Sequence, residues 1–152
     1  MRLYLAGPMT GLPHFNFPLF DEVAASLRRM GHAVVSPAEL DDPEDRAMAR
    51  NSVDGHISSV TKTWGDFLAR DVKLLADDGI EGVVVLPDWQ KSRGARLETY
   101  VAHALCNLPI LCLVYNDLDE FYLGELSDLT LWRGWCGERD LVIANRSFGV
   151  QA

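Results

Sequence analysis

The sequence has little of what secreted, membrane and nucleic-acid-binding proteins contain. Its 152 residues include three cysteines without a Cys-x-x-Cys pair, so a disulfide framework or a zinc site of that kind is not expected. The first apolar run is too short for a signal peptide, and no segment reaches a membrane-spanning length. A net charge of −8 disfavours binding to a nucleic-acid polymer. We therefore expect a cytoplasmic protein without nucleic-acid or membrane partners.

Several widespread ligand-binding motifs are also missing. The loop Gly7-Pro8-Met9-Thr10-Gly11 has neither the Gly-x-Gly-x-x-Gly spacing of a dinucleotide site nor the Gly-Lys-Ser/Thr ending of a P-loop. The four histidines are dispersed without metal-ligand spacing, and no serine occurs in a Gly-x-Ser-x-Gly context. These absences predict a protein without a bound metal or cofactor and without serine-hydrolase chemistry.

What is present is an alternation of apolar strands and amphipathic helices. The composition, 48% hydrophobic and 24% charged, is that of an ordinary globular protein, and 152 residues suit one domain over 1–152. Because the strands are apolar throughout, they predict an α/β fold: a doubly wound, Rossmann- or flavodoxin-like parallel sheet of about five strands with helices on both faces. The expected strands are Leu3–Ala6, Ala33–Ser36, Ile80–Leu86, Pro109–Tyr115 and a candidate last one at Leu141–Ala144, and the expected helices are 20–30, Trp64–Asp77 and Gly94–Cys106.

Two parts of the chain do not fit this alternation. Residues 38–62 are polar and long for a connection, which predicts a lid-like insertion. Residues 116–152 form a C-terminal extension whose pattern is weak. Trp132 and Trp135 in this extension are interpreted as packing or subunit contacts.

Two carboxylates fall within the apolar arcs of the predicted helices. At 100° per residue, Glu98 lies among the apolar positions 97, 101, 102, 104 and 105, with Arg96, Thr99, His103 and Asn107 on the opposite arc. Asp71 likewise lies within the arc of positions 64, 67, 68, 74 and 75. A carboxylate on a core-facing side is costly to bury unless it is paired or used. Arg70 and Arg93 are possible ion-pair partners, so a structural role and a chemical role both stay open.

A turn suited to anion binding precedes Glu98. Ser92-Arg93-Gly94 follows a buried-looking strand and opens a helix, where backbone N–H groups point outward. Trp89 lies close to this turn. It is interpreted as an exposed rim residue, as a core residue, or as an aromatic that stacks on a base.

These residues together resemble the nucleoside 2-deoxyribosyltransferase-like superfamily. It contains deoxyribosyltransferases, 2′-deoxynucleoside 5′-phosphate N-hydrolases, and short phage and bacterial proteins of unassigned role. The resemblance covers about residues 1–115 and rests on three ordered segments. They are Leu3-Tyr4-Leu5-Ala6-Gly7-Pro8-Met9-Thr10-Gly11, Arg70-Asp71, and Ser92-Arg93-Gly94-Ala95-Arg96-Leu97-Glu98.

The resemblance implies chemistry at the N-glycosidic bond of a 2-deoxyribose nucleotide or nucleoside. Glu98 matches the nucleophile that attacks the anomeric carbon, Asp71 the carboxylate near the leaving base, and Tyr4 an aromatic hydroxyl beside the nucleophile. An anionic carboxylate against the sugar suits an oxocarbenium-like transition state. The expected substrate-binding residues are Gly7, Pro8, Met9, Trp89, Ser92, Arg93 and Gly94.

Ser92 discriminates between substrates within this resemblance. Transferases acting on free nucleosides have Asp at the matching position, whereas the monophosphate hydrolases have Ser. Because an Asp would repel a phosphate, Ser92 favours a deoxynucleoside 5′-monophosphate. Base exchange remains a second hypothesis. A nucleotide-binding or sensing module without turnover, suggested by the acidic insertion and Arg96, is a third. The superfamily often completes its site from a neighbouring subunit, so we expect a homodimer or larger homo-oligomer.

Overall fold

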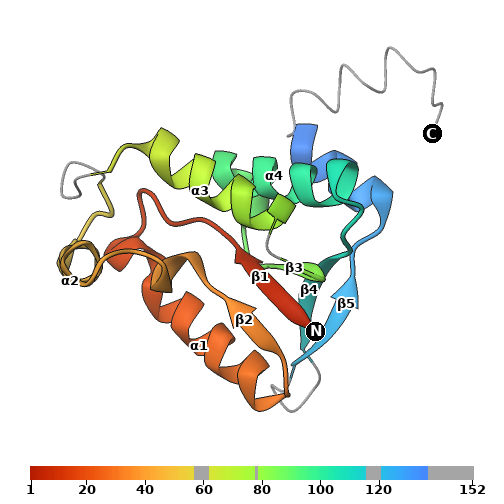
Figure 1. Cartoon of the computed structure of the whole chain (residues 1–152), viewed down its shortest axis with the longest axis horizontal. Helices are drawn as coiled ribbons and strands as arrows, with labels where there is room; N and C mark the ends of the chain where they lie inside the picture. The colour runs from red at the N-terminus through yellow and green to blue at the C-terminus, as the bar shows by residue number, and fades with distance from the viewer. Residues whose placement is uncertain (57–61, 78, 116–120, 137–152) are drawn as a thin grey trace.

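One five-stranded sheet, ordered β2-β1-β3-β4-β5, organises the protein (Figure 1). The computed structural model describes residues 1–56, 62–77, 79–115 and 121–136. The strands are β1 (Arg2–Ala6), β2 (Ala33–Val35), β3 (Gly82–Val85), β4 (Ile110–Tyr115) and β5 (Phe121–Glu125). The first four run parallel and β5 is antiparallel to β4. The predicted α/β fold is confirmed, with one antiparallel edge strand as a correction.

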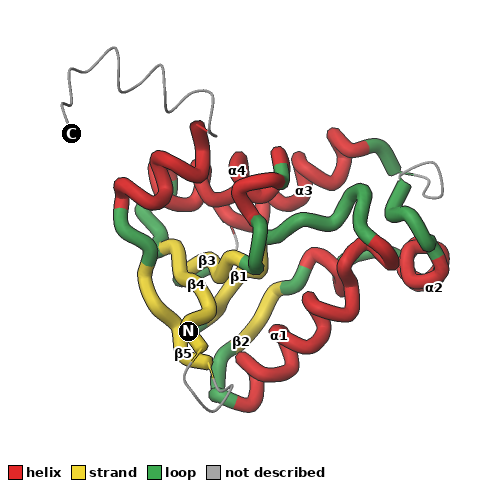
Figure 2. The backbone as a smooth tube through the Cα atoms, turned by 180° about the vertical axis from the view of Figure 1, so that it is seen from behind, coloured by secondary structure: helices red, strands yellow, loops and turns green. Residues whose placement is uncertain are grey.

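Both faces of the sheet are covered, which explains why its four parallel strands are largely apolar. Leu3 and Leu5 of β1 pack with α1 (Phe17–Arg29) on one face, while Tyr4 and Ala6 belong to the cluster on the other face. Figures 1 and 2 show α3 and α4 on the side of the sheet opposite α1. Within the described residues, no helix is both long enough and apolar enough to cross a bilayer.

The helices differ from their predicted ranges at some ends. α3 covers Trp64–Asp77 as expected. α4 covers Arg93–Tyr100 and continues as one π-helical turn over Val101–Leu105. The insertion at 38–62 is not one irregular loop, since it contains a 3₁₀ turn (Pro37–Glu39) and α2 (Pro43–Asn51). α2 was missed because only Asp45 and Ala49 are buried in it, and two positions give no apolar periodicity.

The last described elements also differ from expectation. β5 and a helix over residues 128–136 lie in the extension, whereas the candidate strand at 141–144 falls outside the described residues. β5 is only half-buried and contains Gly124. A Cβ on Gly124 would lie 2.8 Å from Val114 Cγ2, so close strand contact requires glycine and weakens the strand pattern.

The strand order places a crevice between the carboxyl ends of β1 and β3. The chain leaves β1 towards β2 on one side and later enters β3 on the other side, and such switch points are where open α/β sheets bind ligands. Gly7 follows β1 here, and a Cβ on it would lie 2.9 Å from Leu86 Cβ. The glycine therefore allows the ends of the two central strands to approach each other.

Candidate active site

A pocket opens at this crevice and collects segments that are distant in the sequence. Its walls come from the loop after β1, the start of α1, residues 37–49, α3, and the first turns of α4. Phe15, Phe17 and Phe67 give it an apolar side, whereas Asp41, Arg70, Asp71 and Glu98 give it a charged one. The pocket therefore has one wall that suits a flat apolar group and another that suits a polar group.

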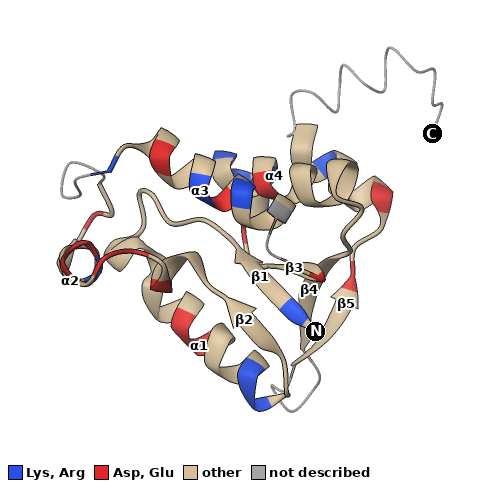
Figure 3. Cartoon of the chain, viewed as in Figure 1, with Lys and Arg blue, Asp and Glu red and all other residues tan. Residues whose placement is uncertain are grey.

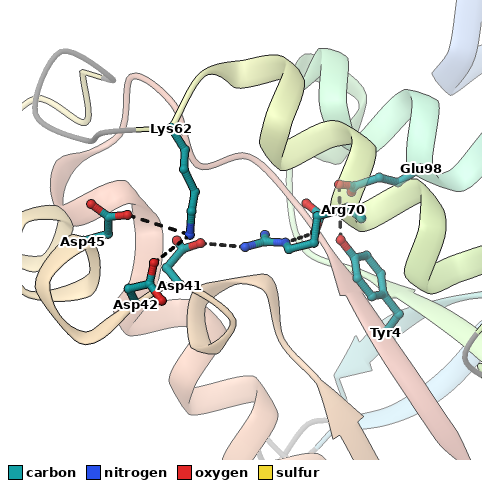
Figure 4. Close-up of polar contacts among 8 residues, drawn as sticks. Tyr4, Asp41, Asp42, Asp45, Lys62, Arg70 and Glu98 are labelled. Atoms are coloured by element: carbon teal, nitrogen blue, oxygen red, sulfur yellow. Dashed lines mark hydrogen bonds and ion pairs between the residues drawn. The ribbon is translucent and has the colours of Figure 1, made fainter.

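Tyr4, Asp71 and Glu98 meet beside this pocket. Tyr4 is the third residue of β1 and fully buried, and its hydroxyl donates a hydrogen bond of 3.3 Å to Glu98 Oε1 (Figure 4). Asp71 on α3 and Glu98 on α4 are 6% and 7% exposed, and both line the pocket. The three residues expected to carry the chemistry are thus brought together from three elements.

Glu98 is buried without an ion-pair partner among the described residues. Burial raises the pKa of its carboxyl to about 8, and the nearby negative charge of Asp71 adds to the rise, while the Tyr4 hydroxyl and Arg70 oppose it. At neutral pH the carboxyl of Glu98 therefore holds a proton. A side chain fixed only for packing would not need a carboxyl group here, so the site favours the chemical role over the structural one.

Asp71 has a different environment because Arg70 contacts it. Arg70 Nε donates to Asp71 Oδ1 at 2.8 Å, and Arg70 Nη1 donates to Asp41 Oδ1 at 2.6 Å. Burial raises the pKa of Asp71, and the hydrogen bond and charge of Arg70 lower it. Arg70 therefore forms the anticipated ion pair with Asp71 but not with Glu98.

The turn at residues 92–94 borders the same pocket and a second, adjoining cavity. Ser92 caps α4 by accepting a hydrogen bond of 3.2 Å from the N–H of Ala95. Ser92, Gly94 and Met9 line both cavities, whereas Pro8 and Arg93 line only the second among the two. Arg93 Cζ lies 5.5 Å from the centre of the Trp64 ring. The turn therefore lies between the pocket that contains Asp71 and Glu98 and an adjoining cavity lined by Arg93.

Trp89 requires a correction, because the structure does not bring it to the pocket. Its side chain is 3% exposed and belongs to the core on the α3–α4 face. A Cβ on Gly134 would lie 2.2 Å from the Trp89 ring, so the 128–136 helix packs directly on it. The ring has no free face for a base, and the core interpretation holds.

The predicted arcs of α4 also require correction. Thr99 was placed on the outer arc but is fully buried, while Leu97 and Leu105 are 38% and 70% exposed. Thr99 is buried because Trp135 Nε1 donates to its hydroxyl at 3.0 Å. Arg96 Nη1 donates to the Trp135 carbonyl at 3.2 Å, so Arg96 is directed at the 128–136 helix.

Phe15, Phe17, Asp41 and Phe67 line the pocket but were not assigned to the site from the sequence. Asp41 stands in an acidic run that resembles a solvated surface, yet its side chain is 11% exposed. Phe15 has a left-handed backbone (φ 51°) between His14 and Asn16, which are left-handed as well. That run of strained residues is a signal for a functional loop, but the sequence does not display it.

The comparisons with known proteins cover most of the chain. A family model described as "Domain of unknown function (DUF4406)" matches residues 1–111. The matched range includes every residue from Tyr4 to Glu98 discussed above and ends in β4. A search of curated proteins finds no match.

Proposed function

The chain belongs to the DUF4406 family, which is described only as a domain of unknown function, and we propose that it hydrolyses the N-glycosidic bond of 2′-deoxynucleoside 5′-monophosphates. The products are the free base and deoxyribose 5-phosphate. The observation that carries the proposal is the meeting of Tyr4, Asp71 and Glu98 in a pocket that adjoins the Ser92–Gly94 turn. The sugar lies on Glu98 and its phosphate on the turn.

The free site already holds the proton that the first step needs. Glu98 carries it at neutral pH and Asp71 is paired with Arg70. Transfer of this proton from Glu98 to Asp71, with the Tyr4 hydroxyl beside both groups, creates a nucleophile and a general acid together. Glu98 then forms a bond to the anomeric carbon, the bond to the base breaks, and the base leaves with the proton from Asp71.

Water completes the reaction on the covalent deoxyribosyl enzyme. A water oxygen attacks the anomeric carbon, the ester bond to Glu98 breaks, and Asp71 takes the proton from the water. After this step Glu98 is a carboxylate and Asp71 is a carboxylic acid. Return of the proton from Asp71 to Glu98 restores the starting site. Atoms and protons balance over the cycle, with no group required beyond the three side chains and water.

The direct test follows base release. The protein is incubated with each of the four common deoxynucleoside monophosphates, and free base is measured by chromatography. Release of base and deoxyribose 5-phosphate in equal amounts supports the proposal. Formation of a new nucleoside only when a second free base is added indicates base exchange, and tight binding with the nucleotide recovered intact indicates a binding module. Either result contradicts hydrolysis.

Replacement of Ser92 by Asp tests the phosphate subsite. Asp is also a good helix cap, so α4 is expected to keep its start, but its charge repels a 5′-phosphate at the adjoining backbone. We expect kcat/KM for a deoxynucleoside monophosphate to fall by about 100-fold relative to the free nucleoside, the size of lost charge-assisted contacts plus repulsion. The Ser92→Asn variant, which caps without charge, serves as the control. Equal losses in both variants would place the phosphate elsewhere.

We also propose that the protein forms a homodimer through the outer surface of α4 and the 128–136 helix. Leu97 and Tyr100 are exposed on α4, Leu105 on the π-helical turn that continues it, and Leu129 and Trp132 on the 128–136 helix. Exposed apolar side chains gathered on neighbouring helices are typical of an interface. Leu105→Glu is therefore expected to shift sedimentation from dimer to monomer, while Val53→Glu, an exposed apolar residue elsewhere, leaves it unchanged. A monomeric wild-type protein contradicts this proposal.

A further inference from the structure

A chain of alternating charges runs from the surface into the carboxylate pocket (Figure 4). Lys62 pairs with Asp42 at 3.0 Å near the surface. Deeper in, Arg70 lies between Asp41 and Asp71. Arg70 uses two of its five N–H donors in these contacts, one on each carboxylate. Asp41 comes from the segment between Pro37–Glu39 and α2, so two separate parts of the chain share one guanidinium.

This sharing matters because a guanidinium devoted to Asp71 alone would keep that carboxylate ionised. The proposed reaction needs Asp71 to accept a proton from Glu98 and later from water. Four groups act on Asp71: Tyr4 from β1, Arg70 from α3, Glu98 from α4 and Asp41 from the segment before α2. Among them, Arg70 alone carries positive charge. Asp41 is the group placed to offset that charge, since its carboxylate accepts from Arg70 Nη1 at 2.6 Å.

We infer that Asp41 is a positioning residue of the active site, which fixes Arg70 between two carboxylates and so leaves Asp71 able to take up a proton. The inference rests on the proposed function for its catalytic meaning. The effect on Asp71 itself exists whether or not the protein turns over a nucleotide. Asp41 does not contact the reacting atoms in this account and acts only through Arg70.

A simpler explanation is that Asp41 ties the segment before α2 to α3 as a structural contact. Asp42 provides a matched control, because it is the next residue, bears the same charge and also forms one ion pair. The difference lies in position: the Asp42 side chain is 73% exposed and pairs with Lys62, whereas that of Asp41 is 11% exposed and pairs with Arg70. An overall charge effect would act through both residues alike, whereas a purely structural role of Asp41 would lower the stability of its variant without moving the titration of the carboxylates.

The experiment compares D41N with D42N in the full chain. Carboxyl groups labelled with ¹³C are titrated by NMR without ligand, and the pH dependence of kcat and KM is measured for the best deoxynucleoside monophosphate. Loss of one negative charge near the site is expected to lower the apparent pKa of the Glu98–Asp71 pair. The expected decrease is about one pH unit in D41N and a few tenths of a unit at most in D42N. The high-pH limb of kcat is expected to move with it, so that activity on that limb falls about tenfold while KM changes little. D41E, which keeps the charge, is expected to restore the titration.

The possible outcomes separate this inference from the proposed function. A shift in D41N alone supports the inference, and if no variant releases base from any nucleotide, the shift still stands while the hydrolase proposal fails. Equal shifts in D41N and D42N, or lower thermal stability in D41N with an unchanged titration, overturn the inference and leave wild-type turnover as evidence for the function. If D41N does not fold, Asp41→Ser gives the same comparison with the same criteria.

Discussion

Replacing Glu98 with Gln is expected to reduce base release from a deoxynucleoside monophosphate by at least about 1,000-fold, the scale of losing a nucleophile. The amide has nearly the same shape as the carboxyl group and can still accept the Tyr4 hydrogen bond, which is 3.3 Å in the wild type. It cannot ionise, so no bond to the anomeric carbon forms. The measurement is single-turnover base release followed by chromatography.

Binding must survive for this result to identify the nucleophile. Calorimetry on Glu98→Gln is expected to give nucleotide affinity within about tenfold of wild type, because the phosphate and base contacts are unchanged. Glu22→Gln, an exposed glutamate of α1, controls for removal of a carboxylate as such and is expected to keep full activity. Residual activity above about a tenth of wild type in Glu98→Gln contradicts the covalent mechanism.

The four parallel strands were predictable because a strand buried on both faces appears in the sequence as a short run of apolar residues. Leu3 and Leu5 face one core cluster, Tyr4 and Ala6 the other, so no polar residue interrupts β1. The edge strand β5 has only partial burial, and its pattern is correspondingly weak. α2 failed for the same reason, since a helix that buries two residues in nine carries almost no periodicity.

The carboxylate site was predictable in part, for a related physical reason. Glu98 and Asp71 stood out because they interrupt otherwise apolar arcs, and the structure places both at the pocket. Asp41 interrupts nothing, because it belongs to an acidic run, and its burial depends on Arg70 from a distant helix. Thr99 was misplaced because its burial depends on Trp135, which lies 36 residues further along the chain. Contacts of this kind are set by tertiary packing, which local periodicity does not record.

The location of the site follows from topology more than from any motif. The switch point between β1 and β3 places the ends of both strands and the start of α4 together. Gly7 allows those strand ends to lie close to each other. Figure 3 shows both acidic and basic positions on α3 and α4, the two helices that contribute charged residues to the pocket. Two buried carboxyl groups at this place lower the free energy of unfolding, and this loss can be measured.

Glu98→Gln is expected to stabilise the folded protein, by an amount that depends on pH. The pKa of Glu98 is raised from its ordinary value of 4.5 to about 8 in the folded protein. Between these values the unfolded chain releases this proton and the folded protein retains it, so wild-type stability falls as pH rises from 4.5 to 8 and then levels off. At about 1.4 kcal/mol per pH unit, the loss is on the order of 5 kcal/mol. Asp71, whose pKa is also raised by burial, acts in the same direction.

Urea unfolding of both proteins at pH 5, 6, 7 and 8 measures this difference. The free energies of unfolding are expected to nearly coincide at pH 5 and to separate steadily towards pH 8, with the Gln variant more stable. Glu22→Gln is expected to follow the wild type throughout. Curves for wild type and Glu98→Gln that stay parallel across this range mean that the folded protein ionises Glu98 as readily as the unfolded chain does. A variant that gains stability while it loses activity identifies a residue kept for chemistry, because selection for folding alone would have replaced it.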